Sequence, residues 1–209
     1  MWDSLVSLIN GGIVAMLIRG GITMLPLLMA SLISLTVVIE RFYFWWSLRP
    51  KRVGRTILSL VAEGNLEAAL HLASTSRHPV ARVLRAGLTA PAPSAGTVMQ
   101  ATAQTELSQA RRYLPILDTI ITLAPLLGLL GTITGMISAF GIVSEAGLGQ
   151  PHAITGGVAE ALIATATGLL IAIATLIPYN YFRAKVEQLT DLIEEGATRL
   201  ELLLTPQED

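Results

Sequence analysis

The chain has 209 residues, of which 52% are hydrophobic and only 14% are charged, and its formal net charge is −1. A soluble domain carries about 25% charged residues, so this composition argues against an ordinary soluble domain and against disorder. The small net charge leaves no basic excess for binding nucleic acid, and the absence of cysteine excludes disulfides, thiolate metal sites and cysteine nucleophiles.

The first 19 residues, 1–19, are predicted to form a short helix that lies in the membrane interface on the periplasmic side. The start Met1-Trp2-Asp3 has no positive charge, and no small-residue cleavage pattern follows the first apolar stretch, so a signal peptide does not fit. Trp2 is suited to anchor such a helix among lipid headgroups.

Three runs without a charged residue follow, at positions 20–39, 119–144 and 161–182. Each is long enough to cross a bilayer core, which takes about 20 helical residues. A buried core helix of a soluble protein is the alternative, but so short a chain would rarely need three. We therefore predict an all-α membrane protein with three transmembrane helices and long cytoplasmic helical extensions. The expected transmembrane helices cover residues 20–46, 114–144 and 158–182.

Basic residues predict the orientation of these helices. Those between the first and second spans are Arg49, Lys51, Arg52, Arg55, Arg77, Arg82, Arg85, Arg111 and Arg112. Those after the third span are Arg183, Lys185 and Arg199. The short connection over 145–157 has neither Lys nor Arg, so the positive-inside rule predicts that it is periplasmic. The same rule predicts a periplasmic N-terminus and a cytoplasmic C-terminus.

The cytoplasmic loop over residues 47–113 reads as helical. Apolar stripes begin near Val53 and Leu66, with a break at Gly64-Asn65, and a third short helix opens at His78-Pro79.

Both the second and third spans are expected to continue into the cytoplasm. No strong breaker occurs from Ala95 until Pro115, so we expect one long helix to run into the second span. Apolar residues also recur at helical spacing through the cytoplasmic tail over 183–209, which predicts that the third span continues there.

Small residues mark one face of the second span. Gly128, Gly131 and Gly135 fall on one stripe of a helix, and Thr132 lies close to it. Glycines at this spacing allow helix backbones to approach closely. The threonine hydroxyl has two interpretations, since it either bonds its own backbone four residues earlier or serves a polar pathway.

The third span is rich in small and hydroxylated residues, including Thr165 and Gly168, which favours a helix surrounded by protein or lining a pore. Glu160 stands in its outer third, where an ionisable group is costly and indicates function. A carboxylate solvated at the membrane edge, or one that caps a helix start, is the alternative.

Asp118 lies at the inner end of the second span and has two interpretations. It either pairs with Arg111 or Arg112, or stands at the mouth of a cation path. The Glu40-Arg41 pair at the inner end of the first span is interpreted as an interfacial ion pair. The histidines have no partner at metal-ligand spacing, and no nucleophile–base constellation or nucleotide-binding loop occurs. The sequence therefore predicts no metal, no cofactor and no enzyme.

Two segments carry a family resemblance. The second-span sequence from Ala124 to Phe140, APLLGLLGTITGMISAF, and the third-span sequence from Ala159 to Leu169, AEALIATATGL, resemble those of the ExbB/TolQ/MotA proton-channel family. The three spans and the large first cytoplasmic loop are closest to ExbB and TolQ, because MotA proteins have four spans.

The resemblance implies a homo-pentamer in the bacterial inner membrane, around a one-span partner of the ExbD/TolR type that carries a membrane aspartate. Thr132 and Thr165 match the hydroxyl-bearing pore positions next to that aspartate, and Glu160 matches the third-span glutamate. The proton motive force would then drive a TonB- or TolA-like periplasm-spanning protein.

Two positions depart from the family pattern, and two other functions remain open. Ala174 stands where a proline is expected, with Pro178 one turn later, and Thr134 replaces an aromatic residue. A non-conducting membrane scaffold would explain the glycines but not the threonines on both helices. A self-sufficient cation channel would use Glu160 as its ring.

Overall fold

The structure, a computed structural model, describes residues 21–48, 52–146 and 151–204. The predicted interfacial helix lies outside this part of the chain. The described residues form helices and no strand, which confirms the all-α prediction. The chain divides into two compact units. Unit 1 comprises Met1–Val38 and Pro115–Tyr179, and unit 2 comprises Ile39–Leu114 and Asn180–Asp209.

Three helices among the described residues are long and apolar enough to cross a membrane, as predicted. They are α2 (Met24–Ser47), α7 (Leu114–Ala146) and α8 (Pro151–Leu204). Helix α8 begins at Pro151, earlier than the expected position 158, because proline is favoured in the first helical turn, where its missing N–H costs nothing. It also continues through Pro178 without ending.

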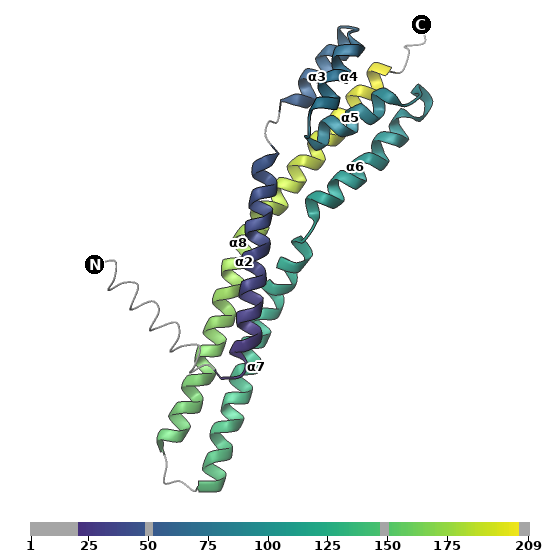
Figure 1. Cartoon of the computed structure of the whole chain (residues 1–209). Helices are drawn as coiled ribbons and strands as arrows, with labels where there is room; N and C mark the ends of the chain where they lie inside the picture. The colour runs from purple at the N-terminus through teal and green to yellow at the C-terminus, as the bar shows by residue number, and fades with distance from the viewer. Residues whose placement is uncertain (1–20, 49–51, 147–150, 205–209) are drawn as a thin grey trace, which may run out of the picture. The chain divides into compact units, whose positions relative to one another are not determined.

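Within unit 1, α2, α7 and α8 pack side by side (Figure 1). The buried positions of α7 are Leu117, Ile120, Ala124, Gly128, Gly131, Gly135 and Ala139. Those of α8 are Ala161, Ala164, Gly168, Ala172 and Thr175. Both series recur every three or four residues, so each helix buries one stripe. Met24, Leu27 and Ala30 of α2 complete a cluster with Ile120 and Ala124.

Glycines let the backbones of α7 and α8 approach one another. A Cβ atom at Gly128 would lie 3.0 Å from the carbonyl oxygen of Ala164, and one at Gly135 would lie 3.0 Å from that of Gly157. At Gly168 it would overlap the carbonyl oxygen of Ala124. Larger residues at these positions would force the two helices apart.

Unit 2 contains three short helices, α3 (Val53–Ala62), α4 (Leu66–Thr75) and α5 (Pro79–Thr89), then a 3₁₀ turn, η1 (Ala92–Ser94), and α6 (Ala95–Arg111). The breaks between the first three follow the sequence signals. Gly64 adopts a φ of 77°, and the Asn65 side chain caps α4 by accepting a hydrogen bond from the N–H of Ala68 at 3.2 Å.

The core of unit 2 forms where α5 and α6 pack with the last part of α8. A Cβ atom at Gly87 of α5 would lie 2.5 Å from the Met99 sulfur and 3.0 Å from the Leu200 side chain. Phe182, Val186 and Ile193 of α8 are buried as well. The predicted apolar stripe of the tail therefore packs inside a helical unit.

The prediction of one unbroken helix from Ala95 into the second span is wrong. Helix α6 ends at Arg111, Tyr113 takes a φ of 69°, and α7 begins at Leu114. The reason is Pro115, whose ring clashes with the carbonyl four residues earlier and whose nitrogen cannot donate to it. The chain avoids this cost by ending one helix and placing Pro115 in the first turn of the next.

Candidate functional site

Thr132 of α7 and Thr165 of α8 lie together in unit 1, and their hydroxyl groups hydrogen-bond to each other. The Thr165 hydroxyl is also 2.9 Å from the carbonyl oxygen of Gly128, and the Thr132 hydroxyl is 3.3 Å from the same oxygen. Because Gly128 has no side chain, α8 comes close enough for its threonine to reach this carbonyl. Both threonines are partly buried.

The two hydroxyl groups have more hydrogen-bonding capacity than their contacts with each other and with Gly128 use. Each hydroxyl has one proton to donate and two lone pairs that accept. If one threonine donates to the other and the second donates to Gly128, each hydroxyl keeps an unused lone pair. Reversing the direction of the shared bond keeps the pair satisfied. With both protons used in this way, the site can accept a hydrogen bond from a carboxylic acid, and it can donate to a carboxylate when one hydroxyl turns away from its present acceptor.

Glu160 takes a different position from the two threonines. Its side chain is half-buried and packs against Gly21, so closely that a Cβ atom at Gly21 would overlap its carboxylate. Gly21 has a φ of 68°, which a glycine adopts without strain. The structure thus brings Thr132 and Thr165 together, whereas Glu160 contacts the turn that precedes α2.

Asp118 is exposed on α7, and its backbone carbonyl accepts a hydrogen bond from the Thr122 hydroxyl at 3.2 Å. Among the described residues of unit 1, it forms no ion pair. Its role stays a prediction.

A second hydroxyl pair in unit 1 was missed by sequence reasoning. Ser34 of α2 and Thr175 of α8 are both buried, and their hydroxyl oxygens are 2.8 Å apart. Thr175 also lies 2.8 Å from the carbonyl oxygen of Ile171. The signal available was a serine inside an apolar span, since hydroxyl residues there commonly bond a neighbouring helix.

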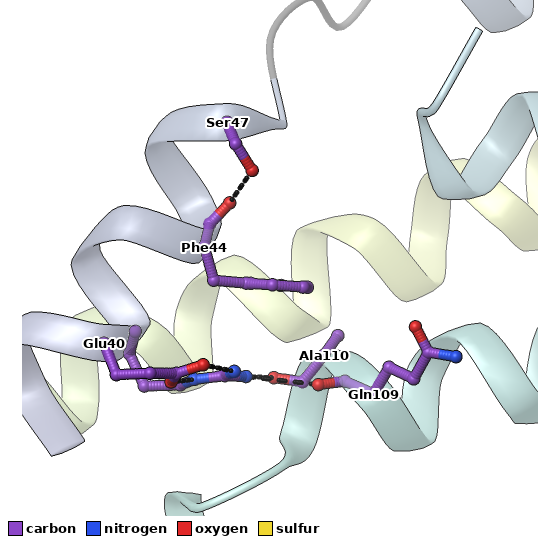
Figure 2. A network of polar contacts seen from close by, with 6 residues as sticks. Glu40, Phe44, Ser47, Gln109 and Ala110 are labelled. Carbon is purple, nitrogen blue, oxygen red and sulfur yellow. Dashed lines mark hydrogen bonds and ion pairs between the residues drawn. The ribbon is translucent and has the colours of Figure 1, made fainter.

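In unit 2, Arg41 is the centre of a polar network, and Figure 2 labels its partners Glu40, Gln109 and Ala110. Its guanidinium donates to both carboxylate oxygens of Glu40, at 2.5 and 2.6 Å, which confirms the predicted ion pair. It also donates to the backbone carbonyls of Gln109, at 3.1 Å, and Ala110, at 3.3 Å. These carbonyls belong to the last turn of α6, which lacks the N–H donors of a following turn. The carbonyl of Gln109 also accepts from the N–H of Arg112 at 3.3 Å.

The network stabilises the point at which α6 ends. Arg41 is only 2% exposed, and its guanidinium lies over the rings of Phe44, at 4.5 Å, and Tyr113, at 5.4 Å. A buried charge is tolerated only when it is paired and hydrogen-bonded, as the Arg41 guanidinium is by Glu40 and the two carbonyls. The sequence predicted the pair with Glu40 and not the cap of α6, because the cap depends on residues 68 positions away along the chain.

Comparisons with known proteins show which family this chain resembles. The profile of the MotA/TolQ/ExbB proton channel family matches residues 75–195. A protein of Synechocystis sp. that bears the name ExbB-like 1 is 38% identical over 195 residues, which cover 89% of this chain and 76% of that protein. ExbB-like 3 of the same organism is 36% identical over 191 residues, covering 88% of this chain and 91% of that protein.

A shorter stretch of the chain is similar to a TolQ protein. The Tol-Pal system protein TolQ of Haemophilus influenzae is 37% identical over 81 residues, which cover 39% of this chain and 36% of that protein. The family profile covers more than half of the chain, and the two longer matches extend over most of it. This chain belongs to the MotA/TolQ/ExbB proton channel family.

Proposed function

We propose that this chain is the proton-channel, stator-like subunit of an inner-membrane motor. The motor uses the proton motive force to energise a TonB- or TolA-like periplasm-spanning protein, for outer-membrane transport or maintenance. The hydroxyl pair of Thr132 and Thr165 carries the proposal, because it joins the two family motifs at one point of the α7–α8 contact. It is a proposal for a channel subunit and not for an enzyme.

The titrating group is proposed to come from a partner chain. A proton path needs one group that changes charge and neighbours that tolerate both of its states. The two hydroxyls meet the second requirement, and neither of them titrates at physiological pH. An ExbD/TolR-like one-span protein with a membrane aspartate would supply the first, enclosed by a homo-pentamer of this chain. The driving force is about 2.3 kcal/mol per charge per 100 mV.

The proposed topology follows the basic residues. The N-terminus and the connection between α7 and α8 would face the periplasm, and the C-terminal tail and the short helices of unit 2 would face the cytoplasm. Unit 1 would then lie within the bilayer.

Replacing either threonine tests the pathway. We expect Thr132→Val and Thr165→Val each to abolish proton flux into vesicles that contain the complex with its partner, since valine keeps the shape and removes the hydroxyl. Matched controls are Thr134→Val on α7 and Thr167→Val on α8, whose hydroxyls bond only backbone carbonyls of their own helix. Wild-type flux in both test variants would remove the pair from the mechanism.

Native mass spectrometry of the complex, extracted gently from its host, tests the assembly. We expect five copies of this chain with a small one-span protein, and the same composition in the two valine variants. A monomer or dimer that persists across detergents would contradict the pentamer and favour the scaffold.

Glu160 is proposed as a second group on the proton path. Its side chain is half-buried against Gly21, and an ionisable residue within a membrane span is costly and indicates function. We expect Glu160→Gln to lower proton flux and downstream work while leaving assembly unchanged. Unchanged flux would make Glu160 a structural residue. Cation flux through this chain alone, lost in the glutamine variant, would instead favour the self-sufficient channel.

A further inference from the structure

A cavity of about 350 Å³ lies in unit 2. Four aromatic side chains form much of its wall, and two residues of α8 add side-chain N–H donors. These residues are Phe42, Trp45, Trp46, Tyr181, Lys185 and Gln188. All of the aromatic ones come from the end of α2 or from α8. The cavity is distinct from the threonine pair, which belongs to unit 1.

One polar group in the cavity wall lacks a partner. The indole N–H of Trp45 is buried and finds no acceptor among the residues that the structure describes. Buried donors are almost always hydrogen-bonded, and an indole nitrogen can only donate. We therefore expect the Trp45 N–H to donate to an acceptor that is not among the described residues.

The charge of the cavity favours an anionic acceptor. Lys185 supplies an ammonium group, which lies 5.4 Å from the Tyr181 ring, and no acidic side chain lines the cavity among the residues that the structure describes. His78 also lines the cavity, has its pKa lowered by burial, and accepts at Nδ1 from the N–H of Val80 at 3.3 Å. It is therefore neutral near pH 7. Together with Trp45 and Gln188, Lys185 forms a set of donors suited to a phosphate.

The position of the cavity along the helices favours a lipid over a free phosphate. The apolar helix α2 ends at Ser47, and the uncharged run of α8 ends at Phe182. The cavity therefore lies where both helices change from apolar to charged residues. The aromatic side chains at this boundary are exposed: Phe42 by 51%, Trp46 by 58% and Tyr181 by 51%. Aromatic residues with a neighbouring cation are typical of the level at which headgroups lie.

We propose that this cavity binds the headgroup of one anionic phospholipid. Its phosphate would lie between the Lys185 ammonium and the Trp45 N–H, with the acyl chains along Phe42 and Trp46. The proposal goes beyond the proton-channel function and does not depend on it, since a membrane protein that conducts nothing could hold the same lipid.

Lipid titration of the full chain, purified with any partner that accompanies it, tests the site. The complex is reconstituted in phosphatidylcholine nanodiscs, phosphatidylglycerol is added, and native mass spectrometry counts the bound lipid per protomer. We expect Lys185→Gln to weaken phosphatidylglycerol binding about fivefold, because it removes the ammonium that would contact the phosphate inside the cavity. Trp45→Phe, which removes only the donor from an aromatic wall, is expected to weaken it about tenfold.

Matched controls separate the cavity from its surroundings. Arg183→Gln removes a charge two positions from Lys185, and Tyr43→Phe removes an exposed hydroxyl near Trp45, and neither residue lines the cavity. Both should bind like the wild type. Equal affinity for phosphatidylcholine, or wild-type binding by both test variants, would overturn the proposal. Displacement of the lipid by inorganic phosphate alone at millimolar concentration would also overturn it and indicate a free-phosphate site. Proton flux measured on the same variants reports on the channel separately.

Discussion

The two units bury different kinds of polar group. In unit 1 the buried polar residues among those described are Thr23, Ser34 and Thr175, and all of them are hydroxyl-bearing. In unit 2 they are Arg41, His78 and Glu106, and all of them are ionisable. A hydroxyl can be satisfied by one backbone carbonyl and one neighbour, whereas a buried charge needs an opposite charge and several hydrogen bonds.

The two solutions require different packing. Unit 1 relies on glycine and alanine, which bring backbones together so that a hydroxyl of one helix reaches a carbonyl of the next. Unit 2 relies on long side chains that reach across a gap, as when Arg82 of α5 donates to both carboxylate oxygens of Glu106 of α6, at 3.0 and 3.1 Å. A helix that carries few charges can enter a bilayer, so the first solution suits the apolar unit.

The largest expected effect is that of a methyl group added where the backbones of α7 and α8 approach most closely at a glycine. Gly168→Ala places a Cβ atom against the backbone carbonyl of Ala124, which cannot rotate away as a side chain could. We expect a loss of about 3 kcal/mol in the free energy of unfolding, at the upper end of ordinary overpacking. The measurement is the denaturation midpoint of the purified protein in detergent.

Gly156→Ala is the matched control for this change. It lies on the same helix, and a Cβ atom there would meet nothing within 4 Å. Alanine should be neutral there, or stabilise the helix by up to about 1 kcal/mol. If Gly168→Ala behaved like this control, the close approach of α7 and α8 would not be what holds unit 1 together.

A somewhat smaller effect is expected from removing the buried charge of unit 2. Arg41→Met removes the guanidinium donor of the Ala110 carbonyl and leaves the Gln109 carbonyl with the Arg112 N–H, while the Glu40 carboxylate, 44% exposed, can be hydrated. We expect a loss of about 2 kcal/mol, the cost of leaving a buried acceptor unbonded. Amide hydrogen exchange should rise in the last turn of α6.

The control for Arg41 is another arginine in an ion pair. Arg183 is 63% exposed and pairs with Glu187 one turn along α8, so Arg183→Met should cost less than about 0.5 kcal/mol. Equal effects of the two substitutions would mean that Arg41 acts only through its charge and does not cap α6.

Sequence patterns predicted the elements of this fold well wherever local signals decide the structure. The three apolar spans, the break at Gly64-Asn65 and the helix start at Pro79 all follow from neighbouring residues. The end of α6 was mispredicted because Pro115 was assigned a kink, whereas the chain starts a new helix there. Whether a proline kinks or interrupts a helix depends on tertiary caps, in this case Arg41.

The candidate site was predictable in part. The two family motifs pointed to Thr132 and Thr165, and the structure brings their hydroxyls together. The contact of Glu160 with Gly21 and the partnership of Ser34 with Thr175 could not be predicted, since each joins residues more than a hundred positions apart. Spacing on one helix says which residues share a face and not which helix that face meets.

The smallest expected effect concerns the hydroxyl pair that unit 1 buries between α2 and α8. A double-mutant cycle with Ser34→Ala and Thr175→Val isolates the bond between them, and we expect a coupling of about 0.6 kcal/mol, as is usual for hydrogen bonds between membrane helices. The value is small because Thr175 retains the Ile171 carbonyl as an alternative acceptor when the serine is removed. The control cycle pairs Ser34→Ala with Thr167→Val, whose hydroxyl bonds only its own helix, and should show no coupling. A coupling above about 2 kcal/mol, a value typical of hydrogen bonds to charged groups, would contradict the distinction drawn between the two units.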